Sequence, residues 1–250
     1  MSSAYLRAAA YLVAGAATFA ALVGPAPAAG PSRVPTTAEA QAENAAVARL
    51  NVAGQGHCTA TLIAPDLALT AAHCLDPRGA ADRVAPGRAH VLAGWRKGRF
   101  TAHYRGAALA TAPGWAPGRT ALDAALIRLT LVSGRPEAVA PLPVSSPPPP
   151  GTALSILSYG RDRAEMLSRE TGCRLVGRRG GLLVTDCEAT PGVSGAPLLA
   201  ETDRGPALVG VVVAAGAARP PAVRGPALAV AAAPLLPALH AALDAAEAGR

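Results

Sequence analysis

The sequence predicts an all-β protein with two β units, a proline-rich linker between them and a helix at the C-terminus. Short strand-like runs recur along the 250 residues with turn signals between them, which is typical of antiparallel barrels and sandwiches. Four consecutive prolines at 147–150 interrupt these runs, and proline is excluded from the interior of a sheet. From 233 to 248 the apolar residues follow a helical period, which indicates a helix after the second unit.

Composition and charge narrow the class of protein. The length suits one large domain or two small ones, and 51% apolar with 16% charged residues is typical of a folded chain. The 23 basic and 16 acidic residues give a net charge of +7, but they are scattered along the chain. Because there is no basic helix and no basic patch interleaved with aromatic residues, we expect no nucleic-acid partner.

Residues 1–28 have the features of a secretory signal peptide. Arg7 supplies a positive start, residues 8–23 are apolar, and the small residues at 26–28 match a cleavage site. The apolar run is shorter than the roughly 20 residues of a membrane span, so an uncleaved anchor is the less favoured alternative. We expect a secreted or periplasmic protein without a membrane span once the signal is removed. The next segment, 29–46, is polar and small, and we expect a mobile leader there.

The N-terminal β unit is expected at 47–135 and the linker at 136–151. The linker is rich in proline and serine, which indicates an extended connector. Turn signals in the N-terminal unit separate six strand-like runs, at 47–52, 58–63, 67–70, 90–93, 99–103 and 124–131.

The second β unit is expected at 152–232 and the helix at 233–250. The run at 207–215 is apolar throughout, which indicates a strand buried on both sides. On the helix, Leu236, Leu239, Ala242 and Leu243 share one face, while Asp244 and Glu247 face outward. The other strand-like runs lie at 153–159, 174–176, 182–185 and 196–200.

The four cysteines fall into two pairs at the ends of predicted hairpins. Cys58 and Cys74 enclose one hairpin, and Cys173 and Cys187 enclose the other. In an exported chain such pairs indicate disulfides, each worth ~3 kcal/mol for a loop of about 15 residues. Metal binding is the alternative, but no Cys-x-x-Cys or paired histidine spacing supports it. We expect no metal and no cofactor.

Ser194 lies within Thr-Pro-Gly-Val-Ser-Gly-Ala-Pro at 190–197. Glycines on both sides permit a tight bend that exposes the hydroxyl and leaves backbone N–H groups unpaired. Acyl transfer needs this combination of a nucleophile and nearby donors for a developing oxyanion. The alternative is a Gly/Pro loop with an incidental serine.

A serine nucleophile needs a base, and His73 is the best candidate. It follows a strand-like run through a turn of small residues, and Cys74 pins the next position. Asp123 opens an apolar strand, so its carboxylate is expected to be partly buried and to orient an imidazole. The alternative for Asp123 is a cap on the preceding turn. For the other histidines (His57, His90, His103, His240) we expect ordinary surface or packing roles, and for Asp66, Asp76, Asp82 and Asp162 solvated turns.

Three motifs occur in a definite chain order. They are Thr-Ala-Ala-His-Cys at 70–74, Asp-Ala-Ala-Leu at 123–126 and Gly-Val-Ser-Gly-Ala-Pro at 192–197. Together with the Gly-Val-Val-Val strand at 210–213, they resemble the trypsin-like (chymotrypsin-fold) serine peptidases, and the compact bacterial branch in particular. The resemblance covers roughly 47–236.

The resemblance implies two six-stranded antiparallel β-barrels with the site in the cleft between them. His73 and Asp123 would come from the first barrel and Ser194 from the second. It also implies that the backbone N–H groups of Gly192 and Ser194 bind the oxyanion. The linker lies where the connection between the barrels is expected.

One departure from the family concerns activation. Position 193 is valine, where animal members carry an aspartate that pairs with the new N-terminus after zymogen cleavage. Valine cannot make that ion pair, so we expect no activation by N-terminal insertion, although Arg33-Val34 resembles an activation site. We expect a pre-formed oxyanion loop, supported by the bridge between Cys173 and Cys187.

The residues that would set specificity are the least defined. Glu188 lies six residues before Ser194, where trypsin-type members carry the acid that selects arginine or lysine. Alternatively, Glu188 points to solvent. Val213 and Ala214 are expected to line the substrate, although they replace the usual Ser-Trp. The strand at 207–215 contains no histidine, which argues against the glutamate-specific bacterial subgroup.

The sequence therefore predicts a monomeric serine endopeptidase that acts on a protein or peptide substrate. The alternative is a non-catalytic binding protein on the same fold, with its basic surface on an anionic envelope component. Members of that kind usually lack one of the three catalytic residues, whereas His73, Asp123 and Ser194 are all present here.

Overall fold

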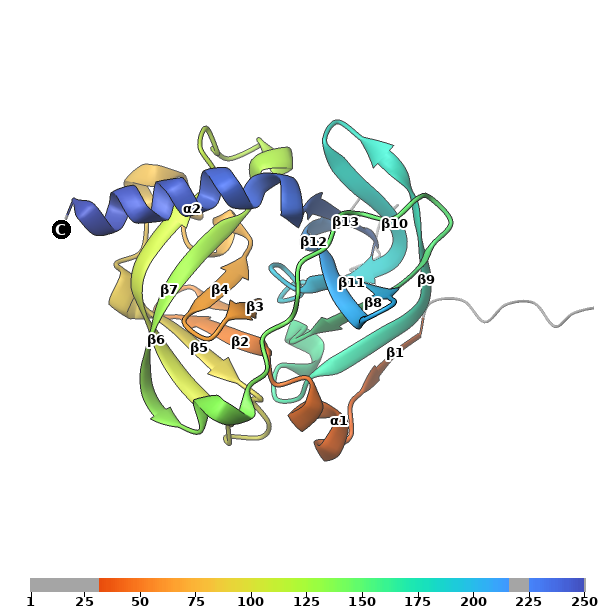
Figure 1. The fold of residues 1–250 in the computed structure, drawn as a ribbon, viewed down its shortest axis with the longest axis horizontal. Coiled ribbons are helices and arrows are strands. Elements are labelled where there is room, and N and C mark those ends of the chain that lie inside the picture. The colour runs from red at the N-terminus through yellow and green to blue at the C-terminus, as the bar shows by residue number, and fades with distance from the viewer. Residues whose placement is uncertain (1–31, 216–224, 250) are drawn as a thin grey trace, which may run out of the picture.

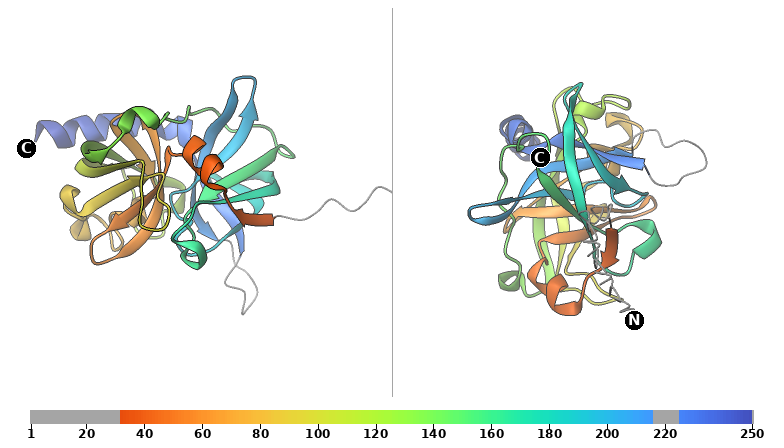
Figure 2. Two further views of the ribbon diagram at one scale, coloured as in Figure 1. Left: turned by 90° about the horizontal axis from the view of Figure 1, so that it is seen from below. Right: turned by 90° about the vertical axis from the view of Figure 1, so that its right-hand side faces the viewer.

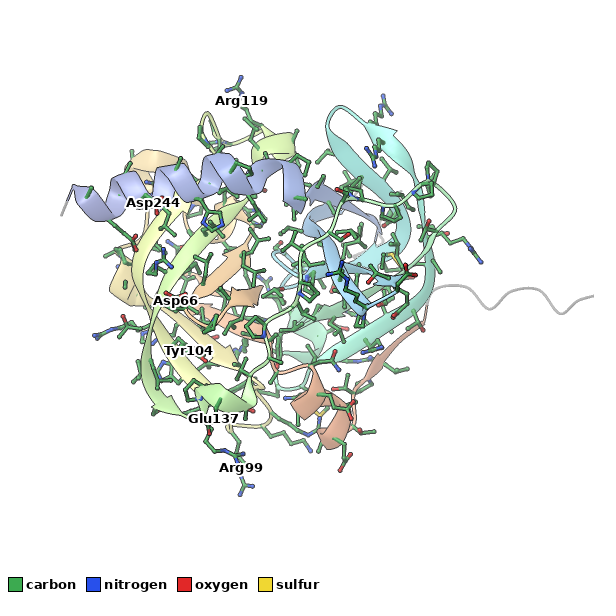
Figure 3. All side chains as sticks on the ribbon, in the orientation of Figure 1. Asp66, Arg99, Tyr104, Arg119, Glu137 and Asp244 are labelled. Carbon is green, nitrogen blue, oxygen red and sulfur yellow. A yellow bond between two sulfur atoms is a disulfide. The ribbon has the colours of Figure 1, made fainter. Side chains whose placement is uncertain are left out.

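The first of two β-barrels packs beside the second in the computed structural model, which describes residues 32–215 and 225–249 (Figure 1). Leu62, Leu69 and Leu126 fill its core and are fully buried. Figure 3 shows Tyr104 inside this barrel, whereas Arg99 and Arg119 project from its surface. The barrel closes in the order β2-β3-β4-β7-β6-β5, from the strands β2 (Val47–Val52), β3 (Gly56–Ala64), β4 (Leu67–Thr70), β5 (Ala89–Ala93), β6 (Ala102–Thr111) and β7 (Ala125–Gly134).

The second barrel is also six-stranded and antiparallel. The strand predicted to be buried on both sides is so, because Leu208, Val209 and Val211 are at most 1% exposed. The barrel runs in the order β8-β9-β10-β13-β12-β11 and closes through the pairing of β11 with β8, from the strands β8 (Ala153–Ser158), β9 (Ser168–Arg179), β10 (Leu182–Ala189), β11 (Pro197–Thr202), β12 (Gly205–Ala215) and β13 (Gly225–Ala231). The predicted fold class is confirmed.

The segment expected to be a mobile leader belongs to the fold from residue 32 onward. Strand β1 (Ser32–Pro35) pairs antiparallel with β9 and adds a seventh strand to that sheet. Helix α1 (Ala38–Glu43) follows, and its N-cap Thr37 accepts a hydrogen bond from the N–H of Ala40. The expectation was wrong because the edge of β9 offers unpaired backbone groups that even a short polar segment can satisfy. The predicted signal peptide lies outside the described residues.

The linker contacts both barrels. The N–H of Leu142 donates to the carbonyl of Leu62 in the first barrel, at 2.9 Å. In the second barrel, Ser145 N–H donates to the Leu208 carbonyl at 2.9 Å, and Leu208 N–H donates to the Pro143 carbonyl at 2.8 Å. These bonds hold the extended chain against β3 and β12.

The predicted C-terminal helix is present as α2 (Ala232–Ala248). It lies across the first barrel and packs on β6 and β7 (Figures 1 and 2). Leu239 and Leu243 are fully buried, as expected. Glu247, expected to face outward, instead pairs with Arg128 of β7 at 2.9 Å. Within the described ranges, no helix is both long enough and apolar enough to span a membrane.

Candidate active site

The loop that carries Ser194 connects β10 to β11 and depends on two glycines. Gly192 and Gly195 have φ angles of +90° and +82°, a region that side chains with a Cβ rarely adopt. A Cβ on Gly195 would lie 2.0 Å from the carbonyl oxygen of Thr59, and one on Gly192 would lie 2.7 Å from that of Tyr159. The loop therefore packs directly against backbone from both barrels, and only glycine fits at these two positions.

The backbone hydrogen bonds of this loop leave two donors unused. Arg161 N–H donates to the Pro191 carbonyl at 2.7 Å, and Ala196 N–H donates to the Val193 carbonyl at 2.9 Å. Because a trans peptide is planar, the following N–H groups, of Gly192 and Ser194, point the opposite way. Within the described part of the chain, neither of these N–H groups donates a hydrogen bond. Two fixed donors on one turn can stabilise an oxyanion.

Thr59 of β3, in the first barrel, holds the loop that carries Ser194, and this residue was not among those expected from the sequence. Its N–H donates to the Ser194 carbonyl at 2.8 Å, and its hydroxyl donates to the Gly192 carbonyl at 3.1 Å. That hydroxyl also accepts from Tyr159 N–H at 3.0 Å, and the Thr59 carbonyl accepts from the Thr70 hydroxyl at 2.8 Å. Thr59 is fully buried, and no local sequence pattern indicates this role, because its partners lie far away in the chain.

His73 and Asp123 contact each other through two hydrogen bonds. His73 lies in a 3-10 turn, η1 (Ala72–Cys74), and Asp123 follows another, η4 (Thr120–Leu122). The His73 ring Nδ1 lies 2.7 Å from Asp123 Oδ2, and the His73 backbone N–H donates to Oδ1 at 2.9 Å. Asp123 is 6% exposed, more deeply buried than the partial burial expected from the sequence, while the His73 side chain is 36% exposed. The ring is therefore fixed at Nδ1 and leaves Nε2 available.

Ser194 and His73 line one cavity of about 230 Å³ at the junction of the barrels. Gly192 and the bridged pair of Cys58 and Cys74 form part of the same wall. Among the described residues the Ser194 hydroxyl has no hydrogen-bond partner, so the two residues share the cavity without a bond between them. Such bonds are often long or absent without substrate and tighten when it binds.

His57 and Asp76 lie in surroundings that differ from those expected from the sequence. His57, expected to have an ordinary role, lines the same cavity, and its Nε2 lies 3.1 Å from the carbonyl oxygen of Tyr159. Burial, together with nearby arginine charges, lowers the pKa of His57. Asp76, expected to be solvated, is fully buried and pairs with Arg83 at 2.9 Å. Burial raises the pKa of Asp76.

The residues expected to line substrate do not line this cavity. Glu188 lies on β10 opposite Pro226 of β13, half-buried, and its N–H donates to the carboxylate of Glu170. Val213 is 5% exposed on β12. Ala214 belongs to the same strand, but its side chain lies outside the described set. Their part in substrate binding stays a prediction.

Both predicted disulfides are present. The bridge from Cys58 to Cys74 ties β3 to the turn that carries His73, and the bridge from Cys173 to Cys187 joins β9 to β10. His73 lies close to the sulfurs of the first bridge. Bridged sulfurs are not thiolates and cannot ligate a metal as cysteinates. That the protein needs no metal remains a prediction.

Two solved peptidase structures share this fold. A Glu endopeptidase, solved in complex with MPD, matches with a TM-score of 0.68 and 19% identity over 86% of this chain and 97% of that chain. A thermostable serine protease, AL20, from an extremophilic microorganism matches with a TM-score of 0.62 and 17% identity over 80% of this chain and 98% of that chain. At these identities the likeness concerns the fold. No curated protein sequence matches the chain.

The paired six-stranded barrels define a chymotrypsin-like fold. A family model described as a trypsin-like peptidase domain matches residues 58–211, which is more than half of the chain and includes His73, Asp123 and Ser194. The chain therefore belongs to the trypsin-like peptidases and is a serine endopeptidase by class.

Proposed function

We propose that the protein hydrolyses peptide bonds through an acyl-enzyme formed on Ser194. His73 acts as the general base and acid, and Asp123 orients it and stabilises its protonated form. The observation that carries this proposal is the hydrogen-bonded pair of His73 and Asp123 in a cavity shared with Ser194. The unpaired N–H groups of Gly192 and Ser194 support the same reaction.

The proposed reaction begins when Ser194 Oγ attacks the carbonyl carbon of the substrate. His73 Nε2 takes the hydroxyl proton, and the carbonyl oxygen becomes an oxyanion that accepts bonds from the N–H groups of Gly192 and Ser194. Collapse of this intermediate breaks the C–N bond, and His73 returns the proton to the leaving amine. Water then attacks the ester with His73 again as base, which releases the acid and restores Ser194.

We further propose a secreted or periplasmic location and a protein or peptide substrate. The two disulfides support an oxidising compartment, and the predicted signal at 1–28 supports export. The choice of side chain next to the cleaved bond stays open, because Glu188 does not line the described cavity.

Labelling with a fluorophosphonate probe tests the proposal. We expect labelling at Ser194 in the wild type, none in Ser194→Ala, and strongly reduced labelling in His73→Ala. Ser133→Ala, which changes an exposed serine of β7, serves as the matched control and should label like the wild type. A folded wild type with both disulfides that takes no label would instead support the non-catalytic binding protein.

A further inference from the structure

The guanidinium of Arg33 is buried beside the loop that carries Ser194. Arg33 lies in β1, at the outer edge of the second barrel next to β9 (Figure 1). Its side chain is only 4% exposed, although arginine is almost never fully buried without partners. Such burial calls for specific partners, and these lie in two loops of the site.

The guanidinium bridges these two loops. Nη1 donates to the hydroxyl of Thr190 at 3.1 Å, and Nη2 forms an ion pair with the carboxylate of Asp162. Thr190 begins the loop that leads to Ser194, and Asp162 is the central residue of η6 (Arg161–Arg163). In addition, Arg163 Nη1 donates to the backbone carbonyl of Arg33 at 2.7 Å, which ties the strand to the same turn.

The bridge lies next to the bond that orients one oxyanion donor. Arg161 N–H donates to the Pro191 carbonyl, and this bond turns Gly192 N–H the opposite way. Arg161 directly precedes Asp162, and Pro191 directly follows Thr190, so Arg33 holds both ends of this contact. If the two loops separate, the Pro191 carbonyl loses its partner and the amide plane is free to rotate.

Gly160 packs closely against the Arg33 guanidinium and leaves no room for a side chain. A Cβ on Gly160 would lie 2.6 Å from Arg33 Nη1 and 2.6 Å from Asp162 Oδ1. Position 193 within the loop is a valine that is 1% exposed, so the loop carries no charge of its own there. The charge that fixes the loop comes from β1.

We propose that Arg33 is a positioning residue that clamps the loop at 190–193 to η6 and so aims the N–H of Gly192 at the oxyanion. This inference rests on the proposed function. It also assigns Arg33 to the working enzyme, so that cleavage after Arg33 inactivates the protein instead of activating it.

The test compares kinetics and fluorophosphonate labelling rates of five variants in the full chain. Arg33→Gln should lower kcat and the labelling rate ~10- to 100-fold with KM changed less than about threefold, because a misaligned donor weakens the transition state alone. Arg33→Lys keeps the charge towards Asp162 and should recover part of the loss. Thr190→Val removes one of the two contacts of the Arg33 guanidinium. The double variant with Arg33→Gln should lose little more kcat than Arg33→Gln alone, because both changes remove the same hydrogen bond. Arg128→Gln, which breaks two ion pairs, with Asp66 and with Glu247, is the matched control and should leave kcat unchanged.

The outcomes separate the clamp from the proposed function. A wild type that neither labels nor cleaves overturns both. If the wild type labels, and Arg33→Gln and Thr190→Val both label at the wild-type rate, the clamp alone is overturned. If Arg33→Gln does not fold, Thr190→Val decides, because it leaves the ion pair with Asp162 in place. A rise in activity after cleavage behind Arg33 also overturns the clamp.

Discussion

Gly195 has no room for a side chain, and this makes it the sharpest test of the packing around Ser194. Gly195→Ala should lower the free energy of unfolding by about 3 kcal/mol, from ~1 kcal/mol of left-handed strain and ~2 kcal/mol of overpacking against Thr59. It should also abolish labelling at Ser194. Urea unfolding measures the first effect and the fluorophosphonate probe the second.

Gly205→Ala is the matched control for this change. Gly205 has a similar φ of +93°, but a Cβ there would meet nothing within 4 Å. The control therefore isolates the backbone strain, and we expect a loss of about 1 kcal/mol with full labelling. Equal losses in the two variants would contradict the close approach of the two barrels at Gly195.

Asp123→Asn tests the orienting carboxylate. An amide can donate a hydrogen bond to the ring and favour the wrong tautomer of His73, so kcat should fall ~10³- to 10⁴-fold with little change in KM. Asp66→Asn changes an exposed carboxylate of a surface ion pair and should leave kcat unaltered. Steady-state kinetics at neutral pH, with a peptide substrate that the wild type cleaves, measure kcat and KM of both variants. A fall below tenfold for Asp123→Asn would show that the pair is not needed.

Two histidines should make stability depend on pH. Burial first, and then arginine charges from Arg49 and Arg161, lower the pKa of His57, although Glu165 and the Tyr159 carbonyl oppose this. In the unfolded chain histidine titrates near about 6.5. The folded state therefore binds fewer protons than the unfolded state as the pH falls below about 6.5, and the free energy of unfolding decreases there.

His103 should act in the same direction as His57. Burial, with His90 and Arg105 nearby, lowers its pKa as well. Urea unfolding between pH 7.5 and 5.5, a range set about the reference pKa of roughly 6.5, should show a loss of stability. The loss should be smaller in His57→Gln and in His103→Gln. If the stability of these variants depends on pH as that of the wild type does, the two histidines titrate alike in the folded and unfolded states.

Single residues differ in how far the sequence reveals them. His73, Asp123 and Ser194 could be proposed because each lies in a short motif whose chemistry is local. Thr59 and Arg33 could not, because their roles arise from partners far away in the chain. The bond from Thr59 to Gly192 spans 133 residues, and the bond from Arg33 to Thr190 spans 157. No local pattern encodes which threonine or arginine meets the loop.

At the scale of elements, strands with clear patterns were predictable, whereas one alanine-rich strand and one short edge strand were not. The limits of β2 and β4 agree with the sequence prediction, because both are strand-like runs between turn signals. Strand β13 was missed since its alanine-rich sequence has no distinct period, and β1 was missed because it is short and polar. The strand expected at 99–103 begins only at Ala102, after a tight turn that includes Lys97 with φ of +47°.

The two disulfides should contribute similarly to stability but differently to activity. They separate cysteines by 16 and 14 residues, so replacing either pair by alanine should cost ~3 kcal/mol in free energy of unfolding. Loss of the pair Cys58 and Cys74 should also reduce kcat, because Cys74 adjoins His73. Loss of the pair Cys173 and Cys187 should reduce kcat less, because other bonds hold the loop before Ser194.

Chemical denaturation and kinetics of the two double-alanine variants measure these effects. From the sequence, we expected the bridge between Cys173 and Cys187 to support the oxyanion loop. The structure adds Arg33 and Arg161, which hold that loop closer to Ser194. If replacing Cys173 and Cys187 lowers kcat more than replacing Cys58 and Cys74, the bridge between Cys173 and Cys187 is the main support of the oxyanion loop.

At the scale of the whole molecule, the site exists only where the two barrels meet. The barrels could be anticipated because motif order and strand spacing follow the chain, but the contacts between them do not follow it. Thr59 of the first barrel binds the loop of the second, and the linker pairs with β3 and β12. Assembly of the site therefore depends on docking as well as on the folding of each barrel.

The most direct test of the acyl-enzyme is its accumulation on Ser194. Mixing the protein with p-nitrophenyl acetate should release a burst of nitrophenol, with one acetyl group per chain found by mass spectrometry on the peptide that contains Ser194. Ser194→Ala should show no burst. Acetyl groups only on other residues, or release that stays linear in folded wild type with no acetyl on Ser194, would contradict catalysis by this serine.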